Sequence, residues 1–222
     1  MINVAIDGPS GAGKSSIAKN VSQRLGYLYI DTGAMFRSLA YKALKNGVNI
    51  SPDNAELKKM LSDTTLDIKR VDSLQHMILD GEDITDFIRT PDVSKAASDI
   101  AVVGFVREWI LGLERTLASQ NNCIMDGRDI GTAVLPNANV KIFLTASAEA
   151  RANRRLIELK EKGIEISFEE LVKEMKYRDE QDANREISPL KQAEDAQLVD
   201  TTNLNFEESC NAIFDIIKRK TN

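Results

Sequence analysis

The sequence of 222 residues has few cysteines, few aromatic residues and no long uncharged stretch. Its two cysteines, Cys123 and Cys210, lie far apart without metal-ligand spacing, so we expect reduced thiols and no disulfide framework. No window long enough to span a bilayer is free of charge, so we expect no transmembrane helix. The N-terminus lacks the basic region and long apolar core of a secretory signal. These absences predict a cytoplasmic protein without a membrane partner.

Basic residues are also in deficit, since 29 Lys and Arg against 34 Asp and Glu give a formal net charge of −5. A protein that coats nucleic acid usually presents a basic face, so we expect no nucleic-acid partner. The only histidine, His76, falls inside a predicted hairpin, where a surface or core role is favoured over catalysis. The length, without repeats or long linkers, predicts one domain, residues 1–222.

Predicted strands and helices alternate along the chain. Apolar runs predict buried strands at 2–6, 27–31, 123–126, 140–146 and 196–201. Helical spacing is found through Ile17, Val21 and Leu25, and in 33–46, 92–119, 148–162, 167–184 and a closing helix that begins at Asn205. Residues 65–81 differ, since two β-rich runs flank a short polar turn and predict a hairpin. The alternation predicts an α/β fold whose parallel sheet is covered on both faces and binds ligands at the carboxyl ends of its strands.

The clearest motif follows the first predicted strand, where residues 4–16 read VAIDGPSGAGKSS. Gly8, Gly13, Lys14 and Ser15 match G-x-x-x-x-G-K-[ST], in which backbone N–H groups converge on phosphate oxygens. Lys14 is expected to reach the β- and γ-phosphates, and the Ser15 hydroxyl is expected to hold Mg²⁺. The alternative is coincidence, which gives such a match in about 1% of chains of this length. The strand before it and the helix after it favour a nucleoside-triphosphate site.

Asp126 follows the apolar residues NCIM at the end of a predicted strand. It is the natural carboxylate to lie near the Mg²⁺ shell. The alternative is an ordinary strand-end aspartate that forms a turn.

Arginines cluster in this acidic chain. Arg37 follows the second strand, and Arg128 follows Asp126. Two further sets each share a predicted helix face: Arg178, Asp182 and Arg185, and also Arg151, Arg154 and Arg155. Any one of these arginines could lie on a solvated surface, but arginine forks bind phosphate well, and their combination with a phosphate loop favours a second bound phosphate.

The shortage of histidine bears on the acceptor. An alcohol acceptor usually needs a positioned base, whereas a phosphate monoester, with a second pKa of about 6, is already ionised at neutral pH. This favours a nucleoside monophosphate, although an aspartate base stays possible. The open alternatives are another small-molecule P-loop kinase, a GTP-binding switch, which the lack of an N-K-x-D element disfavours, and a structural protein that merely contains the loop.

These motifs together resemble the bacterial cytidylate (CMP) kinases. The resemblance is carried by IDGPSGAGKSS, DTGAMFR, GEDITDFIRTPDVSKAAS, VRE, DGRDIGTAVLP, KIFLTAS, EARANRR and YRDEQDANR, which span nearly the whole chain. It implies a P-loop nucleotide-kinase fold with a five-stranded parallel core sheet. It also implies a small β-containing monophosphate-binding insert at about 32–120 and a mobile lid at about 151–166. The implied reaction transfers phosphate from ATP to CMP or dCMP, with Mg²⁺, in a monomer.

The resemblance also implies roles for individual residues. Lys14, Arg128, Asp129 and Arg185 would be catalytic, and Ser15 and Asp126 would serve the metal. The ATP-binding set is Gly8, Pro9, Ser10, Gly11, Ala12, Gly13, Lys14, Ser15, Ser16 and Arg154. The acceptor-binding set is Asp31, Thr32, Arg37, Ser98, Arg107, Arg128, Asp129, Arg178, Asp182 and Arg185.

Within the acceptor-binding set, the resemblance implies a division of labour. Arg37, Arg128 and Arg185 would grip the phosphate. Ser98, Arg107 and Asp129 would read cytosine, and Arg178 and Asp182 would contact the sugar.

The sequence departs from the family's usual pattern at a few positions. Ser15 and Ser16 replace the Gly-Thr often found after the lysine, which leaves open which serine matters more. Thr32 stands where serine is common, and Phe36 stands where tyrosine is common, so a hydroxyl is lost there.

Overall fold

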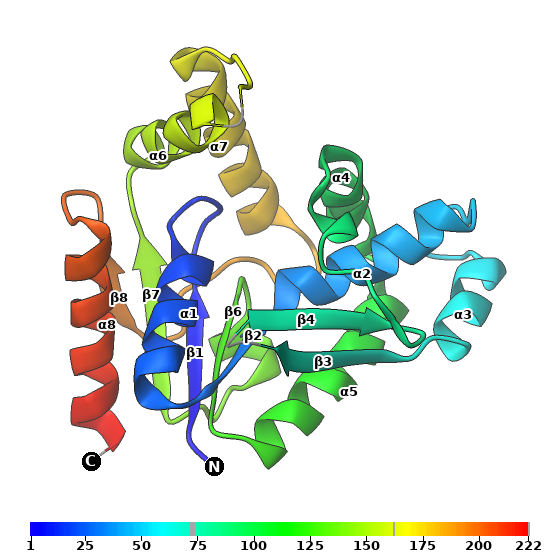
Figure 1. The fold of residues 1–222 in the computed structure, drawn as a ribbon, viewed down its shortest axis with the longest axis horizontal. Coiled ribbons are helices and arrows are strands. Elements are labelled where there is room, and N and C mark those ends of the chain that lie inside the picture. The colour runs from blue at the N-terminus through cyan, green and yellow to red at the C-terminus, as the bar shows by residue number, and fades with distance from the viewer. Residues whose placement is uncertain (72–73, 162, 222) are drawn as a thin grey trace. The chain divides into compact units, whose positions relative to one another are not determined.

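The computed structural model describes residues 1–71, 74–161 and 163–221. Two compact units make up the chain (Figure 1). The first unit contains Met1–Tyr29 and Asn121–Asn222, and the second contains Ile30–Gln120. No helix within the described ranges is long and apolar enough to cross a membrane.

A five-stranded sheet with the order β2-β6-β1-β7-β8 forms the frame of the first unit. Its strands are β1 (Asn3–Asp7), β2 (Leu28–Asp31), β6 (Cys123–Gly127), β7 (Val140–Thr145) and β8 (Gln197–Asp200), with the last two residues of β2 assigned to the second unit. β1 pairs in parallel with β6 and β7, and β7 pairs in parallel with β8. The carboxyl ends of these strands therefore share one edge, and the predicted parallel sheet is confirmed.

One face of the sheet is covered by α1 (Lys14–Leu25) and α8 (Phe206–Thr221), which lie side by side (Figure 1). Val4 and Ile6 of β1 pack into this layer. Ala5 and Met125 point to the opposite face and are also fully buried, as expected for a parallel sheet buried on both faces.

A helical pair, α6 (Ala148–Glu161) and α7 (Phe168–Asn184), follows β7. The two helices pack through Ala152, Leu159, Leu171 and Met175. A capping box begins α7, because Ser167 and Glu170 bond reciprocally to each other's backbone. The predicted helix over 148–162 ends at Glu161, and its last residue lies outside the described ranges.

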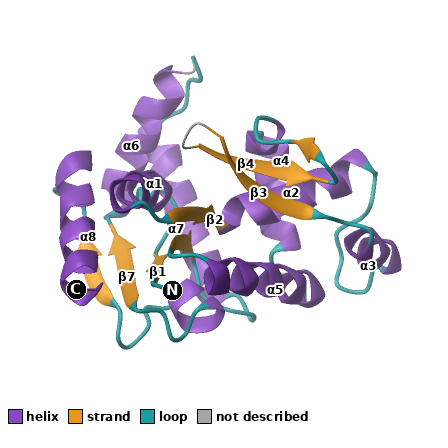
Figure 2. Cartoon of the chain, turned by 60° about the horizontal axis from the view of Figure 1, so that its bottom comes forward, coloured by secondary structure: helices purple, strands orange, loops and turns teal. Residues whose placement is uncertain are grey.

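The second unit begins with α2 (Thr32–Lys45) and α3 (Ala55–Ser62). It continues with an antiparallel sheet of β3 (Leu66–Val71), β4 (Leu74–Leu79) and β5 (Glu82–Asp83) (Figure 2). The 3-10 turn η1 (Phe87–Arg89) leads to α4 (Pro91–Ile100) and α5 (Gly104–Gln120). The predicted hairpin is confirmed, and its turn at 72–73 lies outside the described residues.

Two helices occupy the stretch 92–119 that sequence spacing indicated as helical throughout. The chain leaves α4 at Ala101, whose carbonyl accepts a hydrogen bond of 3.1 Å from Nη1 of Arg107. An arginine that caps the end of the preceding helix has no signature in apolar spacing, so the break was not predicted.

Candidate active site

The phosphate loop connects β1 to α1, and its glycines are required by close packing. A Cβ atom on Gly8 would lie 1.9 Å from the carbonyl oxygen of Leu144, at a backbone φ of +151°. Gly13 has a φ of 89° and caps α1 in the left-handed region. The loop therefore opens onto the N-terminus of α1, whose free N–H groups and dipole favour an anion.

Lys14 is nearly buried, with 5% of its surface exposed, and its Nζ donates a 2.8 Å hydrogen bond to the carbonyl of Pro9. Burial lowers its pKa to about 7, and the positive charge of Arg128 acts in the same direction. The carboxylates of Asp126, Asp7 and Asp182 oppose this shift. A charged lysine at this position therefore lacks the counter-charge that a bound phosphate supplies.

Asp126 accepts two hydrogen bonds of 2.8 Å, one from the Ser15 hydroxyl and one from the Tyr29 hydroxyl. Ser15 thus lies beside the carboxylate that the sequence indicated as its partner. A hydroxyl and a carboxylate offer the hard oxygen ligands that Mg²⁺ takes together with substrate phosphates. The residues present fit a magnesium ion held mainly by the nucleotide. Ser16 is exposed.

Two arginine–aspartate pairs join the loop after β6 to the end of α7. Nε of Arg128 lies 2.6 Å from Oδ2 of Asp182, and Nη2 of Arg185 lies 3.4 Å from Oδ1 of Asp129. The loop after β6 therefore offers a cation, Arg128, and an anion, Asp129, and each pairs with a residue of the opposite charge at the end of α7. Arg185 caps α7 from one residue beyond its end, so it does not share the helix face predicted for it with Arg178. Its Nε also donates to the carbonyl of Ser188.

The three arginines of α6 have different surroundings. Arg151 is buried and forms a bidentate ion pair with Asp179 of α7, and its Nη1 also donates to the carbonyl of Ser10 at 2.9 Å. Arg154 donates to the carbonyls of Thr201 (2.6 Å) and Ala12 (3.4 Å). Arg155 pairs with exposed Glu158. Two of the three therefore support the phosphate loop through its carbonyl groups.

Arg178 takes part in neither of these loop pairs. It is half-buried and pairs with Glu174 one turn earlier on α7. Such surface pairs contribute little to stability, so this geometry leaves Arg178 available to a ligand.

The second unit carries the remaining predicted residues. Asp31 accepts from the backbone N–H of Ala34 at 2.9 Å, which caps α2, and its other oxygen pairs with Arg37 at 2.8 Å. Nε of Arg37 is buried and has no hydrogen-bond partner among the residues that the structure describes. A buried unpaired guanidinium N–H is unfavourable unless a ligand completes it. Thr32 is buried at the start of α2.

The other two predicted residues of this unit lie on α4 and α5. Ser98 is exposed and donates weakly, at 3.4 Å, to the carbonyl of Ser94. The Arg107 guanidinium lies 5.6 Å from the centre of the Phe36 ring. The phenyl group that replaces the family's usual tyrosine therefore supports a cytosine-reading candidate by a cation–π contact.

Comparison with known proteins decides the family. A family model described as cytidylate kinase matches residues 4–219. The chain is 51% identical to the cytidylate kinase of Caldicellulosiruptor bescii over 97% of this chain and 95% of that protein. It is 49% identical to the cytidylate kinase of Caldicellulosiruptor saccharolyticus, with the same coverage of each, 97% and 95%. This chain belongs to the cytidylate kinase family. The resemblance seen in its motifs is confirmed.

A solved structure supports the fold of this cytidylate kinase family member. An uncharacterized protein from Eubacterium ventriosum aligns with a TM-score of 0.57 at 10% identity, covering 98% of this chain and 99% of that chain. At this identity the likeness shows a shared fold alone.

In this cytidylate kinase family member, the sequence did not predict the contacts of three site residues, Tyr29, Asp179 and Asp7. Tyr29 bonds Asp126, Asp179 bonds Arg151, and Asp7 accepts from the backbone of Ile130 and Gly131. Each contact spans between 28 and 124 residues of chain. The strand-end position of Asp7 was the only available signal.

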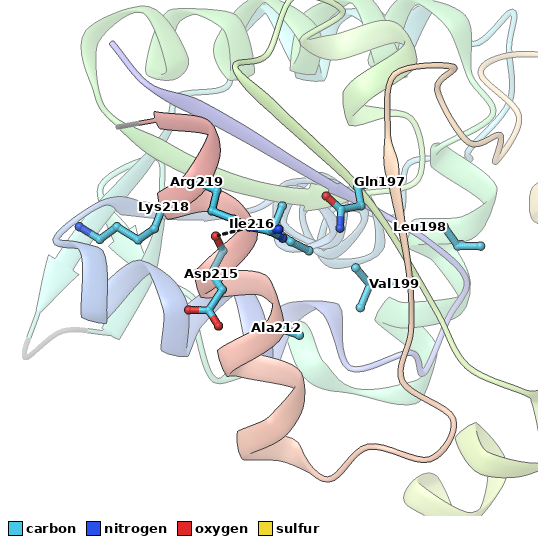
Figure 3. A pocket seen from close by; sticks show the side chains of 8 residues that line it. All are labelled: Gln197, Leu198, Val199, Ala212, Asp215, Ile216, Lys218 and Arg219. Atoms are coloured by element: carbon cyan, nitrogen blue, oxygen red, sulfur yellow. Dashed lines mark hydrogen bonds between the residues drawn. The ribbon is translucent and has the colours of Figure 1, made fainter.

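A separate groove of about 680 Å³ lies between β8 and α8 (Figure 3). Its lining includes the exposed Leu198 and two charged residues, Asp215 and Arg219. Nε of Arg219 donates to the backbone carbonyl of Asp215. None of the predicted site residues lines this groove.

Proposed function

We propose that this protein transfers the γ-phosphate of ATP to CMP or dCMP, giving ADP and CDP or dCDP. The observation that carries the proposal is the phosphate loop, in which Lys14 is buried with its Nζ on the Pro9 carbonyl and the Ser15 hydroxyl lies 2.8 Å from Asp126. Lys14 and Arg128 of the loop after β6 are both cations, and the carboxylates of Asp126, Asp7 and Asp182 offset their repulsion only in part. A phosphoryl group that is being transferred from donor to acceptor brings negative charge to both cations. Such cations stabilise the charge of the transition state.

Ser15 and Asp126 are the residues that would hold Mg²⁺ in this reaction. The ion would neutralise charge on the donor phosphates when bound. The chain itself orients the donor through the loop N–H groups, and Lys14 exchanges its bond to the Pro9 carbonyl for phosphate oxygens. Because the acceptor phosphate is already ionised at neutral pH, no side chain has to remove a proton from it.

We assign cytosine recognition to Asp129 of the first unit and to Arg107 and Ser98 of the second. The N4 amino group of cytosine donates a hydrogen bond that a carboxylate accepts, and N3 and O2 accept from a guanidinium. Asp129 is only 6% exposed. Uracil places a carbonyl oxygen where the amino group was, and a buried unpaired contact of that kind costs about 1–3 kcal/mol.

The proposal is tested by measuring ADP release with CMP, dCMP, UMP and AMP in parallel. We expect kcat/KM for CMP to exceed that for UMP by about tenfold or more. Asp129→Ala should reduce this ratio, because the group that distinguishes an amine from a carbonyl is gone. Equal turnover of CMP and UMP by the natural protein, or an unchanged ratio in the variant, would contradict the assignment.

Binding of MgATP should take up protons at pH 8. With a pKa of about 7, Lys14 is mostly neutral at pH 8 in the free protein. The ATP phosphates are ionised there, since their last pKa is about 6, and they favour the ammonium form and so raise the lysine pKa. Affinity should therefore decrease as the pH rises above 7.

Calorimetric titration in two buffers of different ionisation enthalpy measures this proton uptake directly. The variant Lys14→Met should bind MgATP without the uptake. Proton release on binding, or the same uptake in the variant, would contradict the role given to Lys14.

The cytoplasmic location and the monomeric state stay predictions from the sequence.

A further inference from the structure

The carboxylate of Asp7 binds the main chain of the loop after β6 with both of its oxygens. Oδ1 accepts from the N–H of Ile130 and Oδ2 accepts from the N–H of Gly131, each at 2.7 Å. The side chain is buried, with 4% of the residue exposed. Both donors belong to the first turn of η2, a π-helical turn at Ile130–Val134, where N–H groups have no partner within the helix. Asp7 therefore supplies the acceptors that this turn lacks.

The position of Asp7 in the sheet makes it a rigid support. It is the last residue of β1 and lies opposite Gly127 of β6 and Phe143 of β7 in the parallel register. The next residue is Gly8, which the Leu144 carbonyl confines to a backbone without Cβ. Its backbone thus starts the phosphate loop, while its side chain holds the loop that carries Arg128 and Asp129.

The contact is fitted closely enough to restrict the residue at position 131. A Cβ atom on Gly131 would lie 3.2 Å from Oδ2 of Asp7 and 3.2 Å from Cδ of Lys141. The buried Lys141 is held by its ion pair with Asp195 at 2.9 Å, and the carboxylate oxygen of Asp7 is held by its own hydrogen bond. A glycine at 131 lets the backbone approach Asp7.

The burial of a carboxylate at this position is unfavourable in itself. The pKa of Asp7 is raised to about 6, mainly by burial, and the nearby negative charge of Asp129 acts in the same direction. The two N–H donors and the charge of Lys14 act in the opposite direction. An apolar residue at the end of β1 would avoid this cost but would leave two buried N–H groups without acceptors.

We propose that Asp7 is a positioning residue that holds residues 128–131 in register with the phosphate loop. It acts on the reaction through Arg128 and Asp129 and does not contact either nucleotide itself. This inference rests on the proposed function, because it assigns the acceptor to the loop that Asp7 holds.

The test replaces Asp7 by asparagine, whose amide group keeps one acceptor and turns the other into a donor that faces an N–H. Displacement of the loop should reduce kcat/KM for CMP by about 100-fold, with a rise in the KM for CMP. The KM for ATP should change less than the KM for CMP, because Asp7 reaches the donor site only through the charge of Lys14, whereas it holds the loop of Arg128 and Asp129 by direct hydrogen bonds. Amide hydrogen exchange at Ile130 and Gly131 should accelerate in D7N without nucleotide present.

A purely structural role predicts a different pattern. Loss of folded enzyme lowers kcat while both KM values stay unchanged, and that result would overturn the proposal. An equal rise in the KM for ATP and for CMP, or unchanged exchange at 130–131, would also overturn it.

Gly131→Ala tests the same contact from its other side and remains informative if D7N does not fold. Like D7N, it should raise the KM for CMP. The matched control is Gly112→Ala on α5, where an added Cβ meets no atom within 4 Å and the kinetics should be unchanged. A G131A variant that behaves like G112A would overturn the proposal.

The exchange measurement separates this inference from the proposed function. If the natural protein does not phosphorylate CMP, the proposed function fails while faster exchange in D7N still reports the loop contact. If the natural protein phosphorylates CMP and D7N keeps its KM for CMP, the inference fails and the proposed function stands.

Discussion

Lys14→Met is expected to lower kcat for CMP phosphorylation by about 10³-fold or more, since one preorganised cation opposite the transferring phosphoryl group is worth that much. Methionine fills a similar volume, so the buried site loses its charge and the hydrogen bond to the Pro9 carbonyl but not its packing. The coupled assay of ADP release measures the effect, and the melting temperature reports whether the fold is kept.

Lys19→Met on the same helix is the matched control, because it removes a half-buried lysine one and a half turns further along α1. Its kcat should stay close to that of the natural protein. A Lys14→Met enzyme that keeps a tenth or more of the natural kcat, about 1.4 kcal/mol of barrier, would contradict the role of this lysine.

Arg128→Met is expected to reduce kcat/KM for CMP by about 10³-fold, while the KM for ATP changes little. The substitution removes the proposed phosphate contact and also leaves Asp182 without the partner that lies 2.6 Å away. The unpaired carboxylate adds negative charge where the acceptor phosphate has to bind. Arg128→Lys should recover only part of the loss, because an ammonium group has no second donor for a bidentate contact.

Arg219→Met provides the control for the loss of an arginine. This side chain belongs to α8 and lines the β8–α8 groove, which no predicted site residue lines. Steady-state kinetics with CMP varied at saturating ATP should be unchanged in this variant. An Arg128→Met enzyme with the KM for CMP and the kcat of the natural protein would refute the acceptor-side assignment.

Local patterns predicted most helices and strands, because residues close in the sequence set the ends and buried faces of each element. The apolar run before Asp7 forms β1, Gly26 ends α1 with a φ of 72°, and Ser167 begins α7 with its capping box. β5 escaped prediction since two residues carry no periodicity. α3 was also missed, although Asn54 caps it through its Oδ1.

The part of the candidate site that is formed by sequence motifs could be predicted. The phosphate loop and the neighbourhood of Ser15 and Asp126 follow from one spacing pattern and one strand end. The partners of individual arginines do not, because a helical wheel places Arg151 and Arg155 together but says nothing of Asp179, which lies 28 residues further along the chain. Which arginine binds a ligand and which supports the backbone is decided by such distant carboxylates.

The anchoring of Arg151 also limits how a covering segment can move. Its guanidinium joins the carbonyl of Ser10 to Asp179 of α7, and a Cβ atom on Gly11 would lie 3.4 Å from both Arg151 Cβ and Met175 Sδ. The first turn of α6 and the second half of α7 are therefore attached to the donor loop at fixed points. We therefore expect the lid predicted at about 151–166 to move between these two anchors, which would leave the phosphate loop undistorted.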